Sequence, residues 1–568
     1  MAHLGCSAPA PPQGPRSLLA EKPDGARSQV DVVSIGDESR EALLATQSWT
    51  VSFPRRSILT FGVGIRFDGS GEIPGWGRFV VAIDGREVAK ETVNPRVAHH
   101  WMDVTVEIDS PPSRGVLSIS IRFTDRDGRD LPQPDELRLA VSDPILHDRA
   151  AYGLKRGVIL ISVDTLRRDH VGAYGYAKPT TPTLDGLAGS GVLAEDAVSV
   201  SSWTLPAHLS MMTSVLPGTH GGIDIKQGFN RSVPTLAGML KEAGVATHAV
   251  TAHIYVSKTY GLDDGFDSMN FRQDRLAENV ANHAMDLIDR YGDRPFFIFL
   301  HFYDPHWHYA PPPEVLKIFE SSYAGKLTGN LKDFQNLRPD QVSAADFDHL
   351  LALYDGEIRY TDNQIGRLRA HLKERGVLDS TLMVVTSDHG EEFLEHGSWE
   401  HQKTLFEEVI RVPLIVSGPG VAARRESRPV SLLDVAPTIL DFLSLKPAPS
   451  MKGLSLLRPA PDHRETYGET DNTPDGSRLS FLRNGASSWK AILRIDPVRQ
   501  TVRSSLWFDL KADPGEKTNR PPPESRRAAI EARTSDEALK SRSLAASTPV
   551  ELSAEEKEKL RALGYIGR

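Results

Sequence analysis

The sequence predicts an α/β protein whose main domain is a doubly wound, largely parallel sheet, preceded by an antiparallel β-sandwich. Two observations lead to this prediction. Residues 31–150 hold short segments in which apolar and polar residues mostly alternate, with Gly, Pro and Asp between them, a pattern typical of antiparallel sandwiches. From residue 157 onward, short dense apolar runs alternate with helical stretches. Such runs are typical of strands buried between two layers of helices.

Length and composition limit the kind of protein. The chain has 568 residues, which is room for three or four domains of about 150 residues each. Hydrophobic residues make up 39% and charged residues 25%, so a disordered or fibrous protein is excluded. The formal net charge of −9 argues against nucleic acid as a partner, because binding to the phosphate backbone needs a basic surface. No apolar run approaches the roughly 18 residues of a membrane helix, so we expect no transmembrane segment.

Residues 1–30 are of low complexity and are expected to form a disordered tether. They contain Cys6, the only cysteine, so neither an intrachain disulfide nor a thiolate zinc site can form. Residues 4–7 are similar to the end of a bacterial lipoprotein signal, with the apolar part of that signal missing upstream. On this interpretation the protein is a periplasmic or cell-envelope lipoprotein with a lipid anchor at Cys6. The alternative is an ordinary disordered N-terminus with an incidental cysteine, and the sequence does not decide between the two.

The β-sandwich is predicted as an accessory domain over residues 31–150. Its candidate strands have short, regular spacing and cover residues 57–63, 78–83, 102–108 and 116–121. No cluster of residues suited to catalysis occurs in this part of the sequence. The functional site is therefore expected in the domain that follows.

The main, catalytic domain is predicted over residues 155–445. Five dense apolar runs are expected to be centrally buried parallel strands: residues 158–163, 247–251, 296–301, 382–386 and 413–416. Helices are expected between them, near residues 183–190, 234–242, 276–290 and 352–374. This alternation of strands and helices predicts a doubly wound sheet.

Two further segments follow the main domain. Residues 446–520 are predicted as a C-terminal subdomain, because strand-like runs such as 490–493 recur there. Residues 521–568 are predicted as a linker, rich in Pro, Arg and Ala and partly helical, that ends in a short helix. Ser553 and Glu556 have the spacing of a capping box at the start of that helix.

Polar side chains follow three of the predicted strands, at the edge of the sheet where ligands bind in such folds. Asp164 follows the first strand, Asp304 and His306 the third, and Asp388 with His389 the fourth. A group of Asp and His without Cys suits a divalent cation such as Zn²⁺ or Mn²⁺, or Ca²⁺ where oxygen ligands dominate. A single Asp at a strand end is usually a helix cap or a turn residue, but three polar strand ends together favour a metal site.

Thr204 is the candidate nucleophile. Pro206 fits the first turn of a helix, which places Thr204 at the entrance of that helix. The free N–H groups of a helix start favour an anionic group, and a hydroxyl beside a metal ion can lose its proton and attack. The alternative is that Thr204 only caps the helix, and this segment alone favours the cap.

Together these segments resemble the sulfatase branch of the alkaline phosphatase superfamily. The sulfatase nucleophile motif has the nucleophile, then Pro, then Thr-Gly and Pro-x-x-His-Gly at fixed distances. The residues of this chain that fall on that frame are Thr204, Pro206, Thr213, Pro217, His220 and Gly221. Further segments resemble the first metal strand, the substrate histidine, the second metal pair, the strand after it and the C-terminal subdomain: residues 161–176, 304–306, 386–391, 407–413 and 507–519. The resemblance spans about residues 157–520.

The resemblance implies an alkaline-phosphatase-like α/β/α sandwich with a smaller C-terminal α+β subdomain. It also implies that one divalent metal ion, Zn, Mn or Ca, is bound by Asp164, Thr204, Asp388 and His389. His306 would bind a non-bridging oxygen of the ester or protonate the leaving group. On this view the metal holds the Thr204 oxygen in line with phosphorus, and a phosphothreonine intermediate passes to water or to an acceptor alcohol.

The departures from the family pattern bear on the reaction. Sulfatases hold Cys or Ser at the nucleophile position and oxidise it to formylglycine, whereas a threonine, as a secondary alcohol, cannot give that aldehyde. His208 stands where the family has arginine, Thr165 stands for the second aspartate of its Asp-Asp pair, and residues 251–253 occupy the region of its Gly-Lys-Trp-His segment. A threonine nucleophile with these ligands instead resembles the phosphodiesterases and the enzymes that transfer phosphoethanolamine or phosphoglycerol.

Three residues after the second metal pair are candidates for substrate contact. By the resemblance, His401 or Lys403 would touch the substrate, and His396 is a third candidate. The alternative for all three is a polar surface loop.

Two more pairs have a suggestive spacing. His208 lies one helical turn from Thr204 and would either bind an anion in place of the arginine or simply pack. Asp304 and His308 are four residues apart, which would allow a second metal ion.

Three hypotheses of function follow. The first is a metal-dependent hydrolase of phosphate mono- or diesters with Thr204 as nucleophile. The second, in the same fold, is a sulfate-ester hydrolase that works without formylglycine, or a transferase of phosphoethanolamine or phosphoglycerol. The third is an inactive protein that binds glycans or lipid headgroups through the β-sandwich. The complete set Asp164, Thr204, Asp388 and His389 favours the enzyme, acting on a small-molecule, lipid-headgroup or glycan ester.

Overall fold

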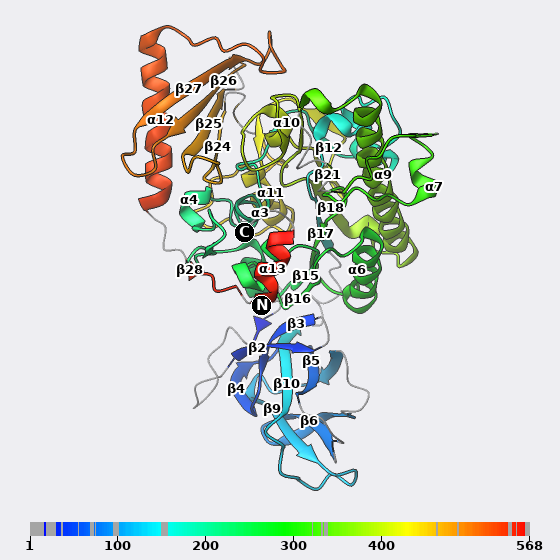
Figure 1. The fold of residues 1–568 in the computed structure, drawn as a ribbon. Coiled ribbons are helices and arrows are strands. Elements are labelled where there is room, and N and C mark those ends of the chain that lie inside the picture. Colours follow the sequence, from blue (N-terminus) through cyan, green and yellow to red (C-terminus); the bar gives the residue numbers. More distant parts are fainter. Residues whose placement is uncertain are drawn as a thin grey trace, which may run out of the picture.

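A computed structural model shows an α/β unit with an all-β unit at one end and a smaller α+β unit beside it (Figure 1). The residues that the structure describes are 16–18, 30–35, 38–54, 56–68, 73, 75–94, 101–148, 157–320, 322–330, 333, 339–459, 461, 464–484, 488–543, 548–552 and 554–562. Cys6 and Ser553 lie outside them, so neither the anchor prediction nor the capping-box prediction is addressed. Among the described residues, no helix is both long and apolar enough to cross a membrane.

The centre of the α/β unit is a sheet whose five middle strands are parallel, in the order β18-β11-β17-β15-β16. Their bounds are β11 (Gly157–Val163), β15 (Ala246–Thr251), β16 (Ser268–Phe271), β17 (Phe296–Phe302) and β18 (Thr381–Thr386). Every residue of β11, β15, β17 and β18 is buried. These are four of the five runs from which the sequence predicted parallel strands, and their continuous apolar character follows from burial on both faces.

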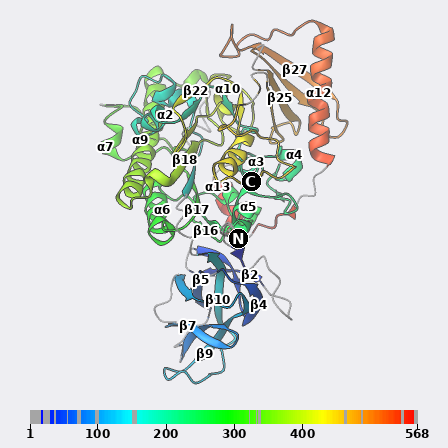
Figure 2. The same cartoon turned by 180° about the vertical axis from the view of Figure 1, so that it is seen from behind.

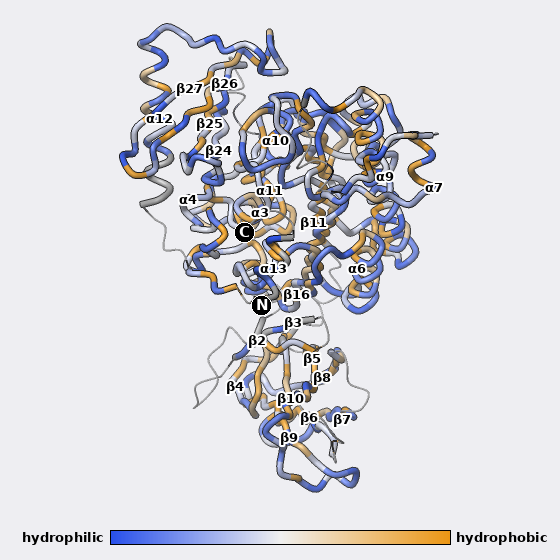
Figure 3. Tube along the Cα trace, viewed as in Figure 1, coloured by the Kyte–Doolittle hydropathy of each residue, from blue (hydrophilic) through white to orange (hydrophobic). Residues whose placement is uncertain are grey.

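Two hydrophobic cores lie on opposite faces of this sheet. Val158 and Leu160 belong to one core, while Ile159 and Ile161 belong to the other, because side chains alternate along a strand. Helices α3 (Thr204–Thr213), α5 (Leu236–Glu242) and α11 (Val435–Phe442) contribute to the first core, and α2 (Pro182–Gly189), α6 (Ala277–Tyr291) and α9 (Ala344–Glu374) to the second. Figure 3 shows apolar residues along the strands and polar residues on the outer helices. The predicted α/β/α sandwich is confirmed.

The strand predicted at residues 413–416 is not parallel, which corrects the prediction. β21 (Leu414–Ser417) pairs antiparallel with β18. A parallel strand needs a crossover connection, usually a helix, that returns the chain to the other end of the sheet. The one helix between β18 and β21 is the short α10 (Glu407–Ile410). The chain therefore re-enters the sheet at the end where β18 finishes, and β21 runs in the opposite direction.

Short elements complete the α/β unit. They are β12 (Val192–Ala194), β13 (Ala197–Val198), β14 (Gln227–Gly228), β19 (Glu392–Phe393), β20 (Trp399–Glu400), β22 (Arg424–Glu426), β23 (Val430–Ser431), α4 (Pro217–His220) and α7 (Pro313–Leu316). Of these, β12 and β22 extend the main sheet beyond β21.

The N-terminal unit consists of two antiparallel sheets around their own core. One contains β3 (Glu38–Leu43), β10 (Leu137–Asp148), β5 (Arg56–Phe67) and β8 (Met102–Asp109), with β2 (Val30–Ile35) beside β3. The other contains β4 (Gln47–Ser52), β9 (Arg114–Thr124), β6 (Trp76–Ile83) and β7 (Arg86–Val93). β3 also pairs antiparallel with β16, so the first sheet continues into the main sheet. No pattern in the sequence predicted this junction.

Part of the predicted tether is structured, which corrects the expectation of disorder through residue 30. β1 (Arg16–Ser17) pairs with β10, and the adjoining Leu18 is fully buried in the core of the sandwich. An apolar side chain that finds a place in a core offsets the entropy lost on ordering a short strand.

The segment predicted as a linker, partly helical, contains a long helix. Helix α12 (Glu524–Ser543) packs Ile530 against the antiparallel sheet β24 (Glu465–Thr470), β25 (Arg478–Asn484), β26 (Trp489–Ile495) and β27 (Val502–Asp509). Figure 2 shows this helix along the outer side of the subdomain. Beyond it, β28 (Thr548–Pro549) pairs with β14, and α13 (Ala554–Ala562) places Leu560 in the main core.

Candidate active site

The candidate site lies where β11 and β18 end and α3 begins. Asp164 follows β11 directly, and its N–H donates to Phe302 O at 2.9 Å, which fixes it beside β17. Asp388 and His389 follow β18. The three side chains are fully buried, and each offers one ligand atom that lies within 4.8 Å of the other two. Chain segments more than two hundred residues apart thus meet at one edge of the sheet, as parallel strand ends do.

Asp388 is held by one of its two carboxylate oxygens. Oδ1 accepts the N–H of His389 at 2.9 Å and the N–H of Thr165 at 3.4 Å. Thr165 has a φ of 55°, in the left-handed region, which turns its N–H toward this oxygen. Oδ2 accepts no hydrogen bond from the described residues although it is buried. One oxygen is therefore used by the backbone and the other is left for a ligand.

Asp164 follows the same pattern. His301 Nε2 lies 3.2 Å from Asp164 Oδ2, and His301 Nδ1 accepts the N–H of Ala252 at 3.4 Å. An imidazole that accepts at Nδ1 carries its proton on Nε2, so His301 donates to Asp164. The other oxygen, Asp164 Oδ1, accepts no hydrogen bond from the described residues.

His389 completes the group with a nitrogen. Its Nδ1 lies 3.0 Å from Gly390 O and donates to it, which leaves the lone pair on Nε2. That Nε2 lies 3.3 Å from Asp388 Oδ2 and 3.7 Å from Asp164 Oδ1. The backbone thus fixes both the tautomer and the orientation of the ring, as is usual for a metal-binding histidine.

These three side chains fit a divalent cation. Burial raises the pKa of Asp164 to about 7, and burial together with Asp164 raises the pKa of Asp388, because two buried carboxylates share the site. A cation between them would offset that cost. Two carboxylate oxygens and one imidazole nitrogen form a ligand set suited to Zn²⁺ or Mn²⁺.

Thr204 faces this group. It is the first residue of α3, its side chain is buried, and its Oγ1 lies 3.4 Å from His389 Nε2. The cap position of the helix is Trp203, so the alternative that Thr204 is the N-cap does not hold. The hydroxyl is directed at the metal ligands instead of at the helix backbone.

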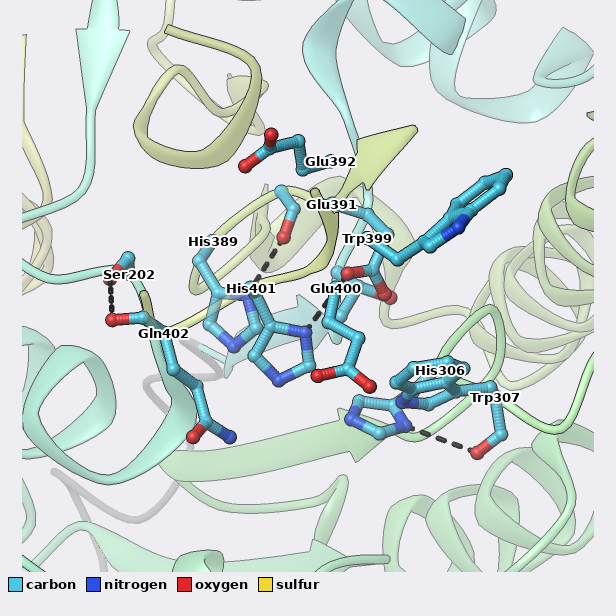
Figure 4. Close-up of polar contacts among 12 residues, drawn as sticks. Ser202, His306, Trp307, His389, Glu391, Glu392, Trp399, Glu400, His401 and Gln402 are labelled. Atoms are coloured by element: carbon cyan, nitrogen blue, oxygen red, sulfur yellow. Dashed lines mark hydrogen bonds and ion pairs between the residues drawn. The ribbon is translucent and has the colours of Figure 1, made fainter. Parts of the chain in front are cut away.

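His306 and His401 stand near His389 (Figure 4). Their rings are 5.1 Å apart at 69°, and the ring of His401 is 4.4 Å from that of His389. His306 Nδ1 lies 3.1 Å from Trp307 O, and His401 Nδ1 lies 3.1 Å from Glu391 Oε1. Burial lowers the pKa of His306 to about 3, so that ring is neutral near pH 7.

His208 is predicted either as an anion ligand or as a packing residue, and its contacts favour packing. Its Nδ1 lies 2.8 Å from Thr204 O and its Nε2 lies 2.9 Å from Ser162 Oγ. Both ring nitrogens are therefore used within the protein, and burial lowers the pKa of His208 to about 4. The packing alternative therefore describes this residue, which joins Thr204 at the start of α3 to Ser162 on β11.

His396 also lies elsewhere than predicted. Its Nδ1 is 2.5 Å from Glu408 Oε1, its Nε2 is 3.3 Å from Glu516 O, and its ring stacks on Phe406 at 3.5 Å. It thus links the α/β unit to the C-terminal subdomain. Lys403 donates to Glu400 Oε2 at 2.6 Å, and its contact with substrate stays a prediction.

Asp304 and His308 do not form a second metal site. Asp304 is buried, accepts the N–H of Ala277 at 2.8 Å and shares a hydrogen bond with the carboxyl group of Glu357. His308 is exposed. Neither belongs to a group of potential metal ligands among the described residues.

The comparison with known proteins settles the family. A model of the Sulfatase family matches residues 156–445, slightly more than half of the chain. The chain belongs to the sulfatase family, within the alkaline phosphatase-like superfamily. The resemblance stated from the sequence is therefore confirmed, and the protein is a hydrolase of sulfate or phosphate esters.

Relatives of this sulfatase-family protein carry several names. The chain is 24% identical to an arylsulfatase of Clostridium perfringens over 443 residues, and this match covers 64% of the chain and 90% of the relative. A structure solved with its substrate, D-glucosamine-2-N,6-O-disulfate, has a TM-score of 0.58 at 19% identity and covers 68% of this chain and 98% of that one. The phosphonate monoester hydrolase of Agrobacterium radiobacter has a TM-score of 0.55 at 20% identity, with 71% and 98% covered. At these identities the two structures establish the sulfatase fold.

The sulfatase-family site contains two histidines that sequence reasoning did not predict as site residues. His301 was assigned only to a strand, and His253 only to a region that departs from the family motif. His253 stacks parallel to Tyr303, with ring centroids 5.7 Å apart, and its ring is 6.1 Å from that of His306. The parallel register, in which His301 is paired with Ser162 two residues before Asp164, is the signal that could have found His301.

Proposed function

We propose that this sulfatase-family protein is a metal-dependent hydrolase of phosphate esters that uses Thr204 as its nucleophile. The observation that carries the proposal is the buried Thr204 Oγ1 at the start of α3, 3.4 Å from His389 Nε2 and next to the metal ligands. A threonine cannot be oxidised to formylglycine, so the alcohol itself must act. An alkoxide that attacks phosphorus directly suits phosphate esters.

The residues of the chain divide the work as follows. Asp164, Asp388 and His389 would hold the cation, which lowers the pKa of a neighbouring alcohol and offsets charge on the ester oxygens. Thr204 releases its proton to solvent and its oxygen forms a bond to phosphorus. The bond from phosphorus to the leaving oxygen breaks, and its electron pair stays on that oxygen. Water then releases the phosphate from Thr204, or an acceptor alcohol takes it if the protein is a transferase.

Sulfate-ester hydrolysis without formylglycine is the second candidate. It is favoured by the sequence relative named arylsulfatase, while the fold shared with a phosphonate monoester hydrolase supports phosphorus chemistry. An alkoxide at Thr204 could attack a tetrahedral phosphorus or a tetrahedral sulfur centre, so measured rates decide between the two candidates.

Initial rates on four esters with one leaving group, 4-nitrophenol, test the proposal. These are the phosphate monoester, a phosphate diester, a phosphonate monoester and the sulfate. We expect a phosphate ester to be the best substrate, and sulfate as clearly the best would contradict the preference for phosphorus.

Thr204→Ala tests the nucleophile in the same assay. We expect turnover to fall at least about a thousandfold, because covalent catalysis is lost, with the melting temperature unchanged; metal content is measured in parallel, since Thr204 is also an expected metal ligand. Thr204→Ser is the matched control, since it keeps a hydroxyl, and it should retain activity. Activity that survives in Thr204→Ala would exclude Thr204 as nucleophile.

A further inference from the structure

His401 and Glu391 form a hydrogen-bonded pair beside the metal ligands (Figure 4). His401 Nδ1 lies 3.1 Å from Glu391 Oε1, and both side chains are 2% exposed. Glu391 Oε2 also accepts the hydroxyl of Tyr309 at 3.4 Å. An imidazole bonded through Nδ1 to a buried carboxyl group presents Nε2 in a fixed direction, which is the arrangement of a catalytic histidine and its orienting acid.

The local fold explains why these two residues meet. Glu391 comes directly after Asp388, His389 and Gly390, so the turn that positions the metal ligands also positions Glu391. β19 then pairs with β20 as a short antiparallel hairpin, with Glu392 opposite Glu400. The residues that flank this pair, Glu391 and His401, therefore lie side by side.

The ring of His401 lies against the catalytic group. Its centroid is 4.4 Å from that of His389 and 5.1 Å from that of His306. The Nδ1 atom of His401 is bonded to Glu391, so Nε2 points away from Glu391, toward the two neighbouring histidine rings (Figure 4). The ring of His401 thus lies beside His389, whose Nε2 is 3.4 Å from Thr204 Oγ1.

We propose that Glu391 is a positioning residue that holds His401 so that His401 Nε2 gives its proton to the leaving oxygen of the ester. This inference rests on the proposed function and assigns one step of it. His306 differs in the partner of its ring, because its Nδ1 lies 3.1 Å from the backbone carbonyl of Trp307, whereas Nδ1 of His401 lies 3.1 Å from a carboxyl oxygen. A carboxyl group stabilises developing charge on an imidazole better than a carbonyl does, so His306 is left to bind a non-bridging oxygen.

The step balances as follows. The Thr204 oxygen forms its bond to phosphorus while the bond to the leaving oxygen breaks and leaves its electron pair there. That oxygen takes the Nε2 proton of His401 and departs as an alcohol, and the proton shared between Nδ1 and Glu391 stays on Nδ1. In the second step a water molecule gives a proton back to Nε2 and attacks phosphorus, and the electron pair of the broken bond returns to Thr204.

A leaving-group series tests the inference. Phosphate esters of 4-nitrophenol, phenol and a simple alkyl alcohol need increasing help from an acid, because their leaving oxygens are increasingly basic. We expect His401→Gln to lose about 100-fold or more in kcat/KM with the alkyl ester and less than about tenfold with 4-nitrophenyl. Glu391→Gln should show the same order of losses at smaller size, since the ring stays but its orientation is loosened. Tyr309→Phe, which removes only one bond to Glu391, should show a still smaller trend.

Glu392→Gln is the matched control. Glu392 is the adjacent buried carboxyl group, but it accepts from Ser398 N at 3.1 Å and Thr404 Oγ1 at 3.2 Å and points away from His401 in Figure 4. It should leave the leaving-group dependence at the wild-type value. Metal content and melting temperature are measured for every variant, so that a general structural loss is recognised by its equal effect on all esters.

The possible results are distinct. If His401→Gln loses the same factor with every leaving group, the inference is overturned. The proposed function still stands in that case, provided that the wild type turns over through Thr204. A steep dependence in His401→Gln with none in Glu391→Gln would overturn the role of Glu391. If the wild type prefers sulfate esters, the same series is run on sulfates and decides the inference in the same way. No turnover of any ester by the wild type would overturn both.

Discussion

The ligand atoms of the candidate metal site are available because each side chain is held by its other polar atom. Asp388 Oδ1 is held by two backbone N–H groups, Asp164 Oδ2 by His301, and His389 Nδ1 by Gly390 O. The remaining atoms of the two carboxylates accept no hydrogen bond from the described residues. A buried polar atom left in this way is costly unless a ligand satisfies it, and this is the main physical argument for a cation here.

His301→Leu tests that argument at a single residue. Leucine has no donor, so Asp164 is free to rotate, and we expect metal affinity to fall about 10- to 100-fold. Metal titration of the chelated protein measures this without any assay of activity. His248→Leu is the control, because His248 is an equally buried histidine on β15 whose Nδ1 bonds to Ser268 Oγ at 2.7 Å, away from the site. Unchanged affinity in His301→Leu would show that Asp164 does not need this bond.

At the scale of elements, helix α9 is joined to the His306 loop by two acids. Asp304, at the end of β17, shares a hydrogen bond with Glu357 on α9, and Glu357 Oε1 accepts the N–H of Ala310 at 2.7 Å. Burial raises the pKa of Asp304 to about 6, and burial together with Asp304 raises the pKa of Glu357 well above its usual range. The loop that carries His306 is thus anchored by a proton shared between two carboxyl groups.

This anchor makes stability depend on pH. Both folded pKa values lie above those of the unfolded chain, so the folded protein keeps protons that the unfolded chain releases. The stabilisation is complete below the unfolded pKa values of about 4 and is lost as pH rises through about 6 and beyond. Glu357→Gln cannot ionise at this position. Its melting temperature should therefore fall less than that of the wild type between about pH 5 and about pH 9. Equal pH profiles would contradict the shared proton.

At the scale of the whole molecule, the β-sandwich and the α/β unit share one sheet. β3 pairs with β16, and beside this junction Arg40 bonds to Asp103 at 2.6 Å while the hydroxyl of Tyr291 donates to Asp103 at 2.7 Å. Burial would raise the pKa of Asp103, but Arg40 outweighs it and holds that pKa below its usual range. The β-sandwich is therefore joined to the α/β unit through a continuous sheet.

Asp103→Ala tests this junction. It leaves Arg40, which is only 2% exposed, without its carboxylate. Because Asp103 is partly exposed, we expect a loss of about 2–3 kcal/mol in the free energy of unfolding, below the full cost of breaking a buried pair. The rate at the distant active site should not change. Asp130→Ala, which breaks an exposed pair with Arg122, should cost less than about 1 kcal/mol.

The same unfolding curves also show whether the two units unfold together. A continuous sheet predicts that the β-sandwich and the α/β unit of the wild type unfold together in urea. Two separate transitions in circular dichroism and tryptophan fluorescence would contradict this view of the junction.

The sequence by itself determined the local features of this protein. The apolar runs of β11, β15, β17 and β18 are continuous because both faces of each strand are buried, and such runs are readable without a structure. Asp164, Asp388 and His389 could be predicted because parallel strands end at one edge of the sheet. Thr204 could be proposed because the absence of Cys or Ser at its position changes the chemistry available.

Only the tertiary structure decided what depends on partners distant in sequence. The antiparallel return of β21, the pairing of β3 with β16 and the packing of α12 depend on neighbours that no local pattern names. The histidines also could not be told apart from sequence. His208 and His396 have both ring nitrogens bonded inside the protein. His401 is held by Glu391 beside the metal ligands. The direction of a side chain is set by its hydrogen-bond partners, and these come together only when the chain folds.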